Sequence, residues 1–180
     1  MKRFLHSLAA PLARFRRDED GGPTIEFTIL VVPVLWMFMS GAEAGLLNMR
    51  SVMLERGTDI AMRAVRLHPD TPPTHEQVKQ MICDQALLIP DCMASLRVEM
   101  RNVPRSAWNS VNSDVECTDR SDEIRPLTRF VPGRASELML VRACVKIAPI
   151  FPTTGLGLML PKDGAGDYAA ISTAAFVNEP

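Results

Sequence analysis

The chain has 180 residues and a mass of 19.9 kDa, which fits one modest domain or a smaller domain with an accessory segment. Hydrophobic residues make up 47% and charged residues 23%, and these ordinary values exclude a wholly disordered chain. The 20 basic and 21 acidic residues give a formal net charge of -1, so the basic excess typical of a nucleic-acid-binding protein is missing. We therefore expect no nucleic-acid partner.

The first third of the chain contains one long apolar stretch, 25–49, in which no charged residue stands between Glu26 and Glu43. As a helix it would rise about 37 Å, more than the roughly 30 Å of a membrane hydrocarbon core. We interpret it as a transmembrane helix, with Glu43 solvated at the far interface. The alternatives are a buried helix of a soluble protein and a secretory signal, although the run is long for a signal and no clear cleavage site follows it.

The helical pattern continues beyond this stretch to about Leu67, where prolines at 69, 72 and 73 end it. Charged residues, Arg50 among them, are expected away from the apolar face of this continuation. The apolar residues expected near one face are Met49, Met53, Ile60 and Ala64.

The rest of the chain, 68–180, predicts a small α+β head with an antiparallel sheet. Thr74 and Gln77 have the spacing of a capping box, which predicts a helix from there to about Leu88, before Pro90. Alternating or continuous apolar residues predict strands, and polar or Pro- and Gly-rich runs predict loops. The expected strands are 96–103, 137–149 and 168–177, and the expected loops are 104–132 and 151–166.

All four cysteines lie beyond the long helix, an arrangement that predicts two disulfides in an oxidising compartment. Three pairings are possible, and we favour Cys83–Cys92 with Cys117–Cys144 because each joins neighbours in the sequence. No Cys-x-x-Cys pair occurs and neither nearby histidine has finger-like spacing, which disfavours a zinc site or a redox-active thiol. We expect no metal and no cofactor, and we expect the head to lie outside the cytoplasm.

Motifs of catalysis are missing from the sequence: there is no Gly-x-Ser-x-Gly, no His-Glu-x-x-His and no phosphate-binding glycine loop. A tethered enzyme is therefore the weakest of the functional interpretations. We expect no catalytic residue and no small-molecule substrate.

The most informative residues lie where the long helix begins. Gly21 and Gly22 end a charged tail, and Glu26 and Phe27 follow at the edge of the apolar stretch. A charged group at the centre of a membrane helix costs about 2.5–3.5 kcal/mol on insertion scales, so a carboxylate kept beside lipid invites a partner. The run Arg16-Arg17-Asp18-Glu19-Asp20-Gly21, then Glu26-Phe27, then Pro33, resembles the TadE-like minor pilins of tight-adherence (Flp, type IVc) pilus systems.

This resemblance implies that a prepilin peptidase removes a cytoplasmic leader, 1–21, by cutting between Gly21 and Gly22. Glu26 then becomes the fifth residue of the mature chain, where the family's carboxylate pairs with a free N-terminal amine during assembly. Small residues are more typical than Pro23 at its position, and a cut directly before Pro23 is disfavoured because proline after a scissile bond is usually refractory. Other implied partners are the inner membrane, further pilins or pseudopilins, and the tight-adherence assembly machinery.

The chain is thus expected to have a leader (1–21), a transmembrane helix with its continuation (22–67) and an extracytoplasmic head (68–180). The expected function is that of a minor pilin or pseudopilin in pilus assembly and surface adhesion. It would cross the bacterial inner membrane once, with a periplasmic head, and associate with the pilus after processing. The alternative is an uncleaved single-pass protein with a disulfide-bonded periplasmic binding module.

Overall fold

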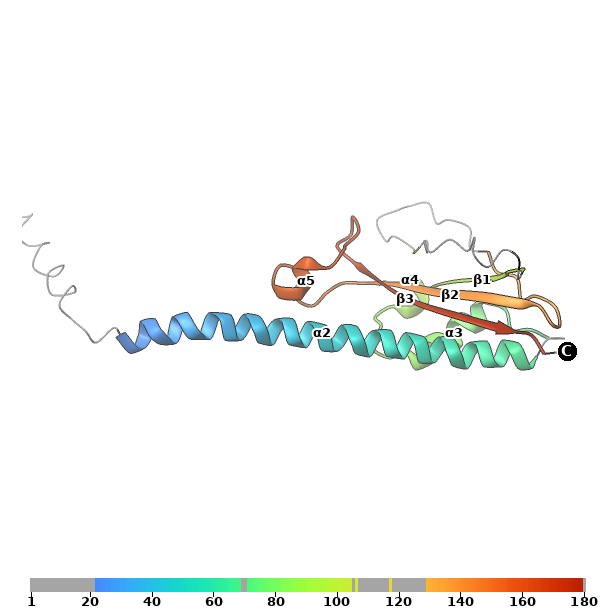
Figure 1. Cartoon of the computed structure of the whole chain (residues 1–180), viewed down its shortest axis with the longest axis horizontal. Coiled ribbons are helices and arrows are strands. Elements are labelled where there is room, and N and C mark those ends of the chain that lie inside the picture. The colour runs from blue at the N-terminus through green and yellow to red at the C-terminus, as the bar shows by residue number, and fades with distance from the viewer. Residues whose placement is uncertain (1–21, 69–70, 105, 107–116, 118–128, 180) are drawn as a thin grey trace, which may run out of the picture. The chain divides into compact units, whose positions relative to one another are not determined.

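The computed structural model describes residues 22–68, 71–104, 106, 117 and 129–179. The chain divides into two compact units, Met1–Met39 and Ser40–Pro180. We call the second the folded unit, and residues 22–39 of the first the exposed segment. The elements along the chain (Figure 1) are α2 (Gly22–Leu67), α3 (His75–Gln85), α4 (Cys92–Ser95), β1 (Arg97–Asn102), β2 (Leu138–Ile147), α5 (Gly155–Met159) and β3 (Tyr168–Val177).

The three strands form one antiparallel sheet in the order β1-β2-β3, as the α+β prediction required. Met100 of β1 pairs with Val141 of β2, which pairs in turn with Ala174 of β3. The bounds of β3 are those predicted, 168–177, and β1 and β2 lie within their predicted ranges. In β1 the apolar Val98 and Met100 alternate with charged residues, which fits a pleated surface with one face turned to a core.

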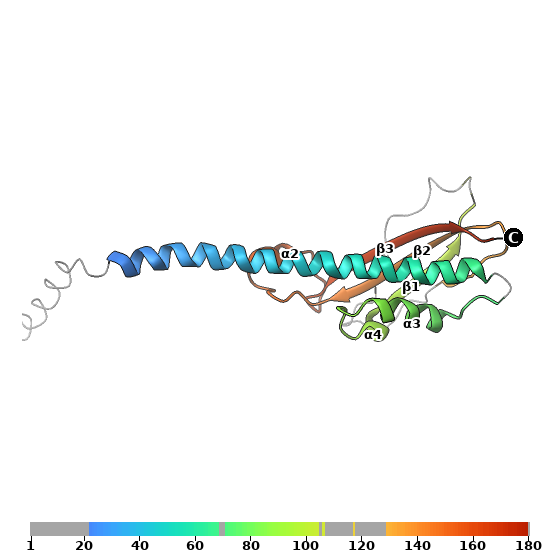
Figure 2. The same ribbon diagram turned by 90° about the horizontal axis from the view of Figure 1, so that it is seen from below.

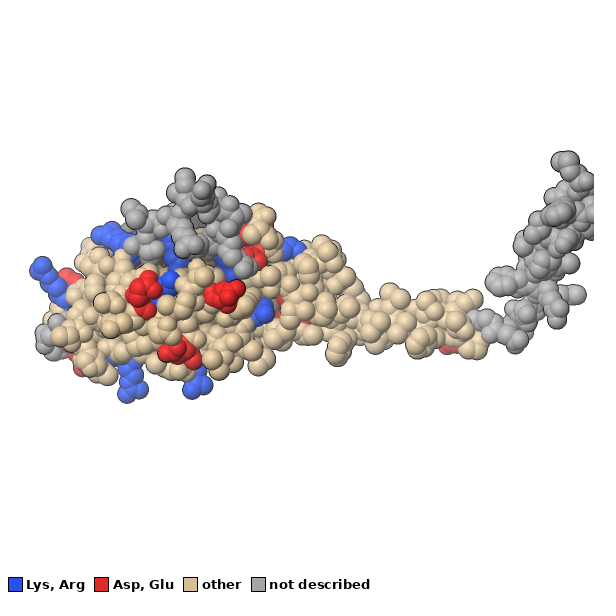
Figure 3. Space-filling view, turned by 180° about the vertical axis from the view of Figure 1, so that it is seen from behind, with Lys and Arg blue, Asp and Glu red and all other residues tan. Residues whose placement is uncertain are grey.

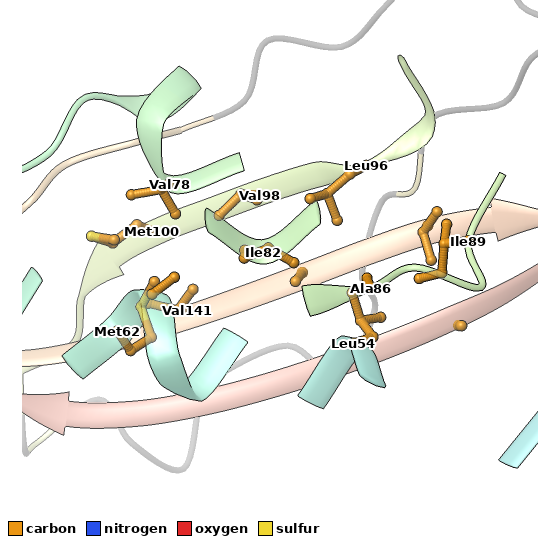
Figure 4. Close-up of a cluster of buried hydrophobic side chains, with 14 of the residues drawn as sticks. Leu54, Met62, Val78, Ile82, Ala86, Ile89, Leu96, Val98, Met100 and Val141 are labelled. Carbon is orange, nitrogen blue, oxygen red and sulfur yellow. The ribbon is translucent and has the colours of Figure 1, made fainter. Parts of the chain in front are cut away.

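Helices α2 and α3 run side by side over one face of this sheet (Figures 1 and 2). Side chains from both helices and from β1 and β2 point toward one another in the core between them (Figure 4). Gly57 permits this close approach, because a Cβ added there would lie 2.7 Å from the carbonyl oxygen of Ile82 in α3. The core residues labelled in Figure 4 are Leu54, Met62, Val78, Ile82, Ala86, Ile89, Leu96, Val98, Met100 and Val141.

The buried face of α2 is not the one predicted from its apolar residues. Met49 and Ile60, expected on that face, are exposed. Arg50, expected away from it, is only 9% exposed. Apolar residues occur all round this helix, so its packing is decided by which side chains the sheet and α3 can accommodate. The buried residues of the helix are Glu43, Arg50, Leu54, Gly57, Thr58, Ala61, Met62 and Val65.

The predicted capping box is present at the start of α3. The Gln77 N–H donates to the Thr74 hydroxyl at 3.3 Å, and the Thr74 N–H donates to the Gln77 side chain at 2.8 Å. The helix ends at Gln85, earlier than the predicted Leu88, because the N–H of Ala86 already closes the last turn onto Ile82 and Cys83. Another difference is α5, a short helix inside the expected loop 151–166.

Both favoured disulfides are found. Cys83–Cys92 joins the end of α3 to the start of α4, with Cα atoms 5.7 Å apart. Cys117–Cys144 attaches the segment before β2 to the middle of the sheet, with Cα atoms 5.5 Å apart. Cys144 and its neighbour Arg142 are buried although they lie on the sheet face opposite to the helices. β2 is therefore buried on both faces, which explains its nearly continuous apolar sequence.

Candidate functional site

The predicted processing and assembly residues lie at the beginning of α2. Gly22 is its first residue, and both Glu26 and Phe27 are exposed on the next turn. Gly21 and the rest of the predicted leader lie outside the described residues. Positions four apart share one face of a helix, about 5–6 Å from each other, so Gly22 and Glu26 lie one above the other. A Cβ added at Gly22 would meet no heavy atom of the described residues within 4 Å.

The exposed segment that follows is apolar on all sides. Ten of its large apolar side chains, from Ile25 to Phe38, are each 51–74% exposed. Figure 3 shows Lys, Arg, Asp and Glu gathered over the folded unit, whereas this segment is almost free of them. By length and composition α2 can cross a membrane. Apolar surface of this extent in water marks a site where lipid or another protein binds.

The exposed segment stops earlier than the predicted membrane part, 25–49. Residues 40–49 belong to the folded unit, and Glu43 among them is only 1% exposed. The predicted solvation of Glu43 is therefore wrong. Its carboxylate accepts hydrogen bonds from the backbone N–H of Ile150 and of Phe151, each at 2.9 Å. Two donors compensate the carboxylate for the water that it loses on burial.

A second charged side chain fastens α2 to the rest of the folded unit. Arg50 donates from Nε to the carbonyl oxygen of Leu88 at 3.2 Å and from Nη1 to the hydroxyl of Tyr168 at 3.0 Å. Leu88 lies between α3 and α4, and Tyr168 opens β3. One arginine therefore joins three parts of the chain.

The sequence did contain a signal for the helix face on which Glu43 and Arg50 lie. Positions 43, 47, 50, 54, 57, 61 and 65 repeat at intervals of four and three, which is the spacing of one helix face. The signal was hidden because the positions 43 and 50 carry charges, and charged residues are ordinarily assigned to the solvent side.

An ion pair joins the two ends of the connection from β2 to β3. Lys146 Nζ lies 2.7 Å from Asp163 Oδ2, and both side chains are largely buried. Asp163 also accepts from the backbone N–H of Asp167 at 2.9 Å and of Ala165 at 3.0 Å. Burial of Asp163 raises its pKa, but the hydrogen bonds and the positive charge of Lys146 outweigh it, so the pKa lies below the ordinary value.

Chemically, the described residues offer binding surfaces. Among 22–68, 71–104, 106, 117 and 129–179, no three His, Cys, Asp or Glu side chains converge as a metal would require. The four cysteines are all in disulfides. The candidate site is therefore the start of α2 and its exposed segment, held to a disulfide-bonded folded unit.

Comparison of the chain with protein-family models, with curated proteins and with solved structures found no match. Its functional assignment therefore rests on the sequence and geometry of its own residues.

Proposed function

We propose that the chain is a minor pilin or pseudopilin-like component of tight-adherence (Flp, type IVc) pilus biogenesis, processed by a prepilin peptidase and active in pilus assembly and surface adhesion. It crosses the bacterial inner membrane once, with its N-terminus in the cytoplasm and its folded unit in the periplasm, and it is not an enzyme. The observation that carries the proposal is a single carboxylate, Glu26, one turn after Gly22 in an exposed apolar helical segment.

The helical geometry places Glu26 where it can pair with a free amine at Gly22. Cleavage between Gly21 and Gly22 creates a positively charged amine at Gly22, where the partial positive charge of the helix N-terminus already disfavours it. Glu26 lies on the same helix face and pairs with that amine or with the amine of a neighbouring subunit. In a low-dielectric surrounding each charge offsets part of the other's desolvation cost.

The exposed segment supports a membrane location before assembly. Water is a poor solvent for ten exposed large apolar side chains, whereas lipid hydrocarbon or the apolar helices of other subunits can cover them. The two disulfides fit an oxidising compartment such as the periplasm. The parts of the chain on either side of Met39 are thus suited to different surroundings.

The test is the N-terminal residue and the intact mass of the membrane-bound protein, made with and without a prepilin peptidase. We expect a chain that starts at Gly22 only when the peptidase is present. Gly21→Val should keep the start at Met1, because a branched side chain does not fit a peptidase site shaped for glycine. Gly41→Val, at a glycine far from the cut, is the matched control and should still be shortened.

Two other outcomes would contradict the proposal. A chain that starts at Met1 in both strains indicates the uncleaved single-pass protein with a periplasmic binding module. A start within or after the exposed segment indicates a secretory signal.

A further inference from the structure

The connection between β2 and β3 has an unusual surface for a loop. No Asp, Glu, Lys or Arg occurs between Lys146 and Lys162. Three of its apolar side chains point outward: Met159 is 75% exposed, Leu158 is 59% exposed and Ile150 is 47% exposed. We call Ile150, Leu158 and Met159 the apolar tip. Loops that face water ordinarily present polar residues at such positions.

Several backbone polar groups of this loop form hydrogen bonds with side chains of the protein. The Glu43 carboxylate accepts hydrogen bonds from the N–H groups of Ile150 and Phe151. Lys162 Nζ donates to the carbonyl oxygens of Pro152 and Gly157, at 2.8 Å each. The loop thus pairs several of its backbone polar groups within the protein and exposes mainly apolar, uncharged side chains, as expected of a segment that faces an apolar medium.

The loop is seated at the first residue of the folded unit. Gly155, at the start of α5, is buried and has a φ of +54°. It packs so closely on α2 that an added Cβ would overlap the hydroxyl of Ser40. Ser40 directly follows Met39, where the exposed segment ends. The contacts of α5 and of Glu43 therefore fall on the first turn of α2 beyond that segment.

The length of the exposed segment decides what surrounds this turn. Residues 22–39 rise about 27 Å as a helix, slightly less than the roughly 30 Å of a hydrocarbon core. A segment that spans the membrane therefore brings Ser40 and Glu43 to the boundary between hydrocarbon and headgroups. Groups that contact Ser40 lie at about the same depth as Ser40.

We infer that the apolar tip inserts into the lipid interface of the leaflet on the side of the folded unit. The inference rests on the transmembrane part of the proposed function. Lipid is the occupant because the tip is uncharged, apolar and fastened where α2 leaves the hydrocarbon, and apolar faces of this kind enter the interface by about 5–10 Å. The chain then contacts the membrane at two places, α2 and the apolar tip, which fixes the orientation of the folded unit on the membrane.

The experiment uses nitroxide labels on the full chain, reconstituted in bilayers of phosphatidylethanolamine and phosphatidylglycerol. Met159→Cys places the label on the apolar tip, and Leu35→Cys places it in the exposed segment. Val177→Cys is the matched control: this side chain is 44% exposed and ends β3, opposite Leu138 at the far end of β2. An intact mass with one label per chain shows that four of the five cysteines are paired, and the mass of the labelled peptide places the label on the introduced cysteine.

Collision of each label with oxygen, which concentrates in lipid, is compared with collision with a water-soluble nickel chelate. We expect the ratio of oxygen to nickel accessibility at 159 to resemble that at 35 and to exceed that at 177 several-fold. Leu158→Cys, on the same tip, should behave as Met159→Cys does.

Three results would overturn the inference. Nickel accessibility at 159 equal to that at 177, with an oxygen-accessible label at 35, removes the tip from the membrane but leaves the transmembrane helix in place. A label at 159 shielded from both reagents, with spin–spin broadening that disappears on dilution with unlabelled chain, shows that a second copy covers the tip. Nickel accessibility at 35 removes the membrane span itself, and the inference with it.

Discussion

Glu43 lies close to the exposed segment of α2 and also takes part in the packing of the folded unit. It follows the exposed segment by one turn, yet its carboxylate is buried and bonded to two backbone N–H groups of the β2–β3 loop. Its partners, Ile150 and Phe151, lie more than 100 residues away in the sequence. The contact therefore closes the folded unit at the end where the exposed segment joins it.

Glu43→Ala should destabilise the protein, because the N–H groups of Ile150 and Phe151 are left without this acceptor. A buried donor that loses its partner costs about 1–3 kcal/mol, so the free energy of unfolding should fall by at least that amount. Thermal unfolding of the full chain in detergent micelles measures the change, and faster deuterium exchange at 150 and 151 locates it. Glu55→Ala, at an exposed position of the same helix, should stay within about 0.5 kcal/mol of the parent. Equal effects of the two substitutions would count against the structural role of Glu43.

Asp163 makes the stability of the folded unit depend on pH. Its pKa is lower in the folded protein than in the unfolded chain, where an aspartate titrates near about 3.9. The carboxylate therefore stabilises the fold above the unfolded pKa, and this contribution is lost as the pH falls through the folded pKa. The ion pair with Lys146 holds together the two ends of the connection that carries α5.

Asp163→Asn should lower the free energy of unfolding at pH 7 by about 1.5–3 kcal/mol, the usual worth of a hydrogen bond to a charged group. The difference from the parent should narrow as the pH falls below about 3.9, because the parent carboxylate is then also neutral. Melting temperatures from pH 7 to pH 2.5 test this. Asp59→Asn, at an exposed position of α2, should change the melting temperature little. A constant gap between Asp163→Asn and the parent at every pH would contradict the assignment.

Among the elements, those set by local residues could be predicted from the sequence. The Thr74–Gln77 capping box, the end of α2 at Leu67 and the bounds of β3 follow from side chains within a few positions of one another. The favoured pairing Cys83–Cys92 also joins near neighbours, with a sequence separation of 9. Such features need little knowledge of the rest of the fold.

The elements' packing could not be predicted in the same way. The face of α2 depends on Arg50 reaching Tyr168 and on Glu43 reaching Ile150, and nothing near Arg50 or Glu43 indicates those partners. From the sequence alone, Gly57 indicates only a weaker helix at that point, because glycine has a low helix propensity. That Gly57 permits the close approach of α3 is seen only in the folded structure.

Gly57→Ala should destabilise the protein even though alanine is the better helix former. The new Cβ would lie 2.7 Å from the carbonyl oxygen and 3.2 Å from the Cα of Ile82, and backbone atoms cannot turn aside as a side chain can. Overpacking of this kind typically costs about 1–3 kcal/mol, which exceeds the gain in helix propensity of up to about 1 kcal/mol. Gly45→Ala is the matched control, because nothing lies within 4 Å of its added Cβ. Melting temperatures should move in opposite directions, and a shift of the same sign for both would refute the close α2–α3 contact.

At the scale of the whole molecule, α2 belongs to two compact units. Up to Met39 its side chains are largely exposed and apolar, and from Ser40 onward it supplies part of a core. The boundary between the two units lies inside one continuous helix, α2. The folded unit and the exposed segment are therefore joined by helical backbone and not by a loop.

A fragment that starts at Ser40 should therefore fold without the exposed segment. It keeps every residue of the buried core and the bonds of Glu43 to Ile150 and Phe151, and tolerance to truncation follows from such burial and hydrogen bonding. We expect it to form both disulfides and to melt within a few degrees of the full chain. In phase separation between water and detergent, the fragment should stay in the aqueous phase, whereas the full chain should enter the detergent phase. A fragment that starts at Ala44 is the comparison, because it lacks Ser40 and Glu43 and should lose at least about 1–3 kcal/mol, as Glu43→Ala does. If both fragments melted at the same temperature, the first turn of α2 beyond Met39 would not be part of the folded unit, and the boundary would lie further along the helix.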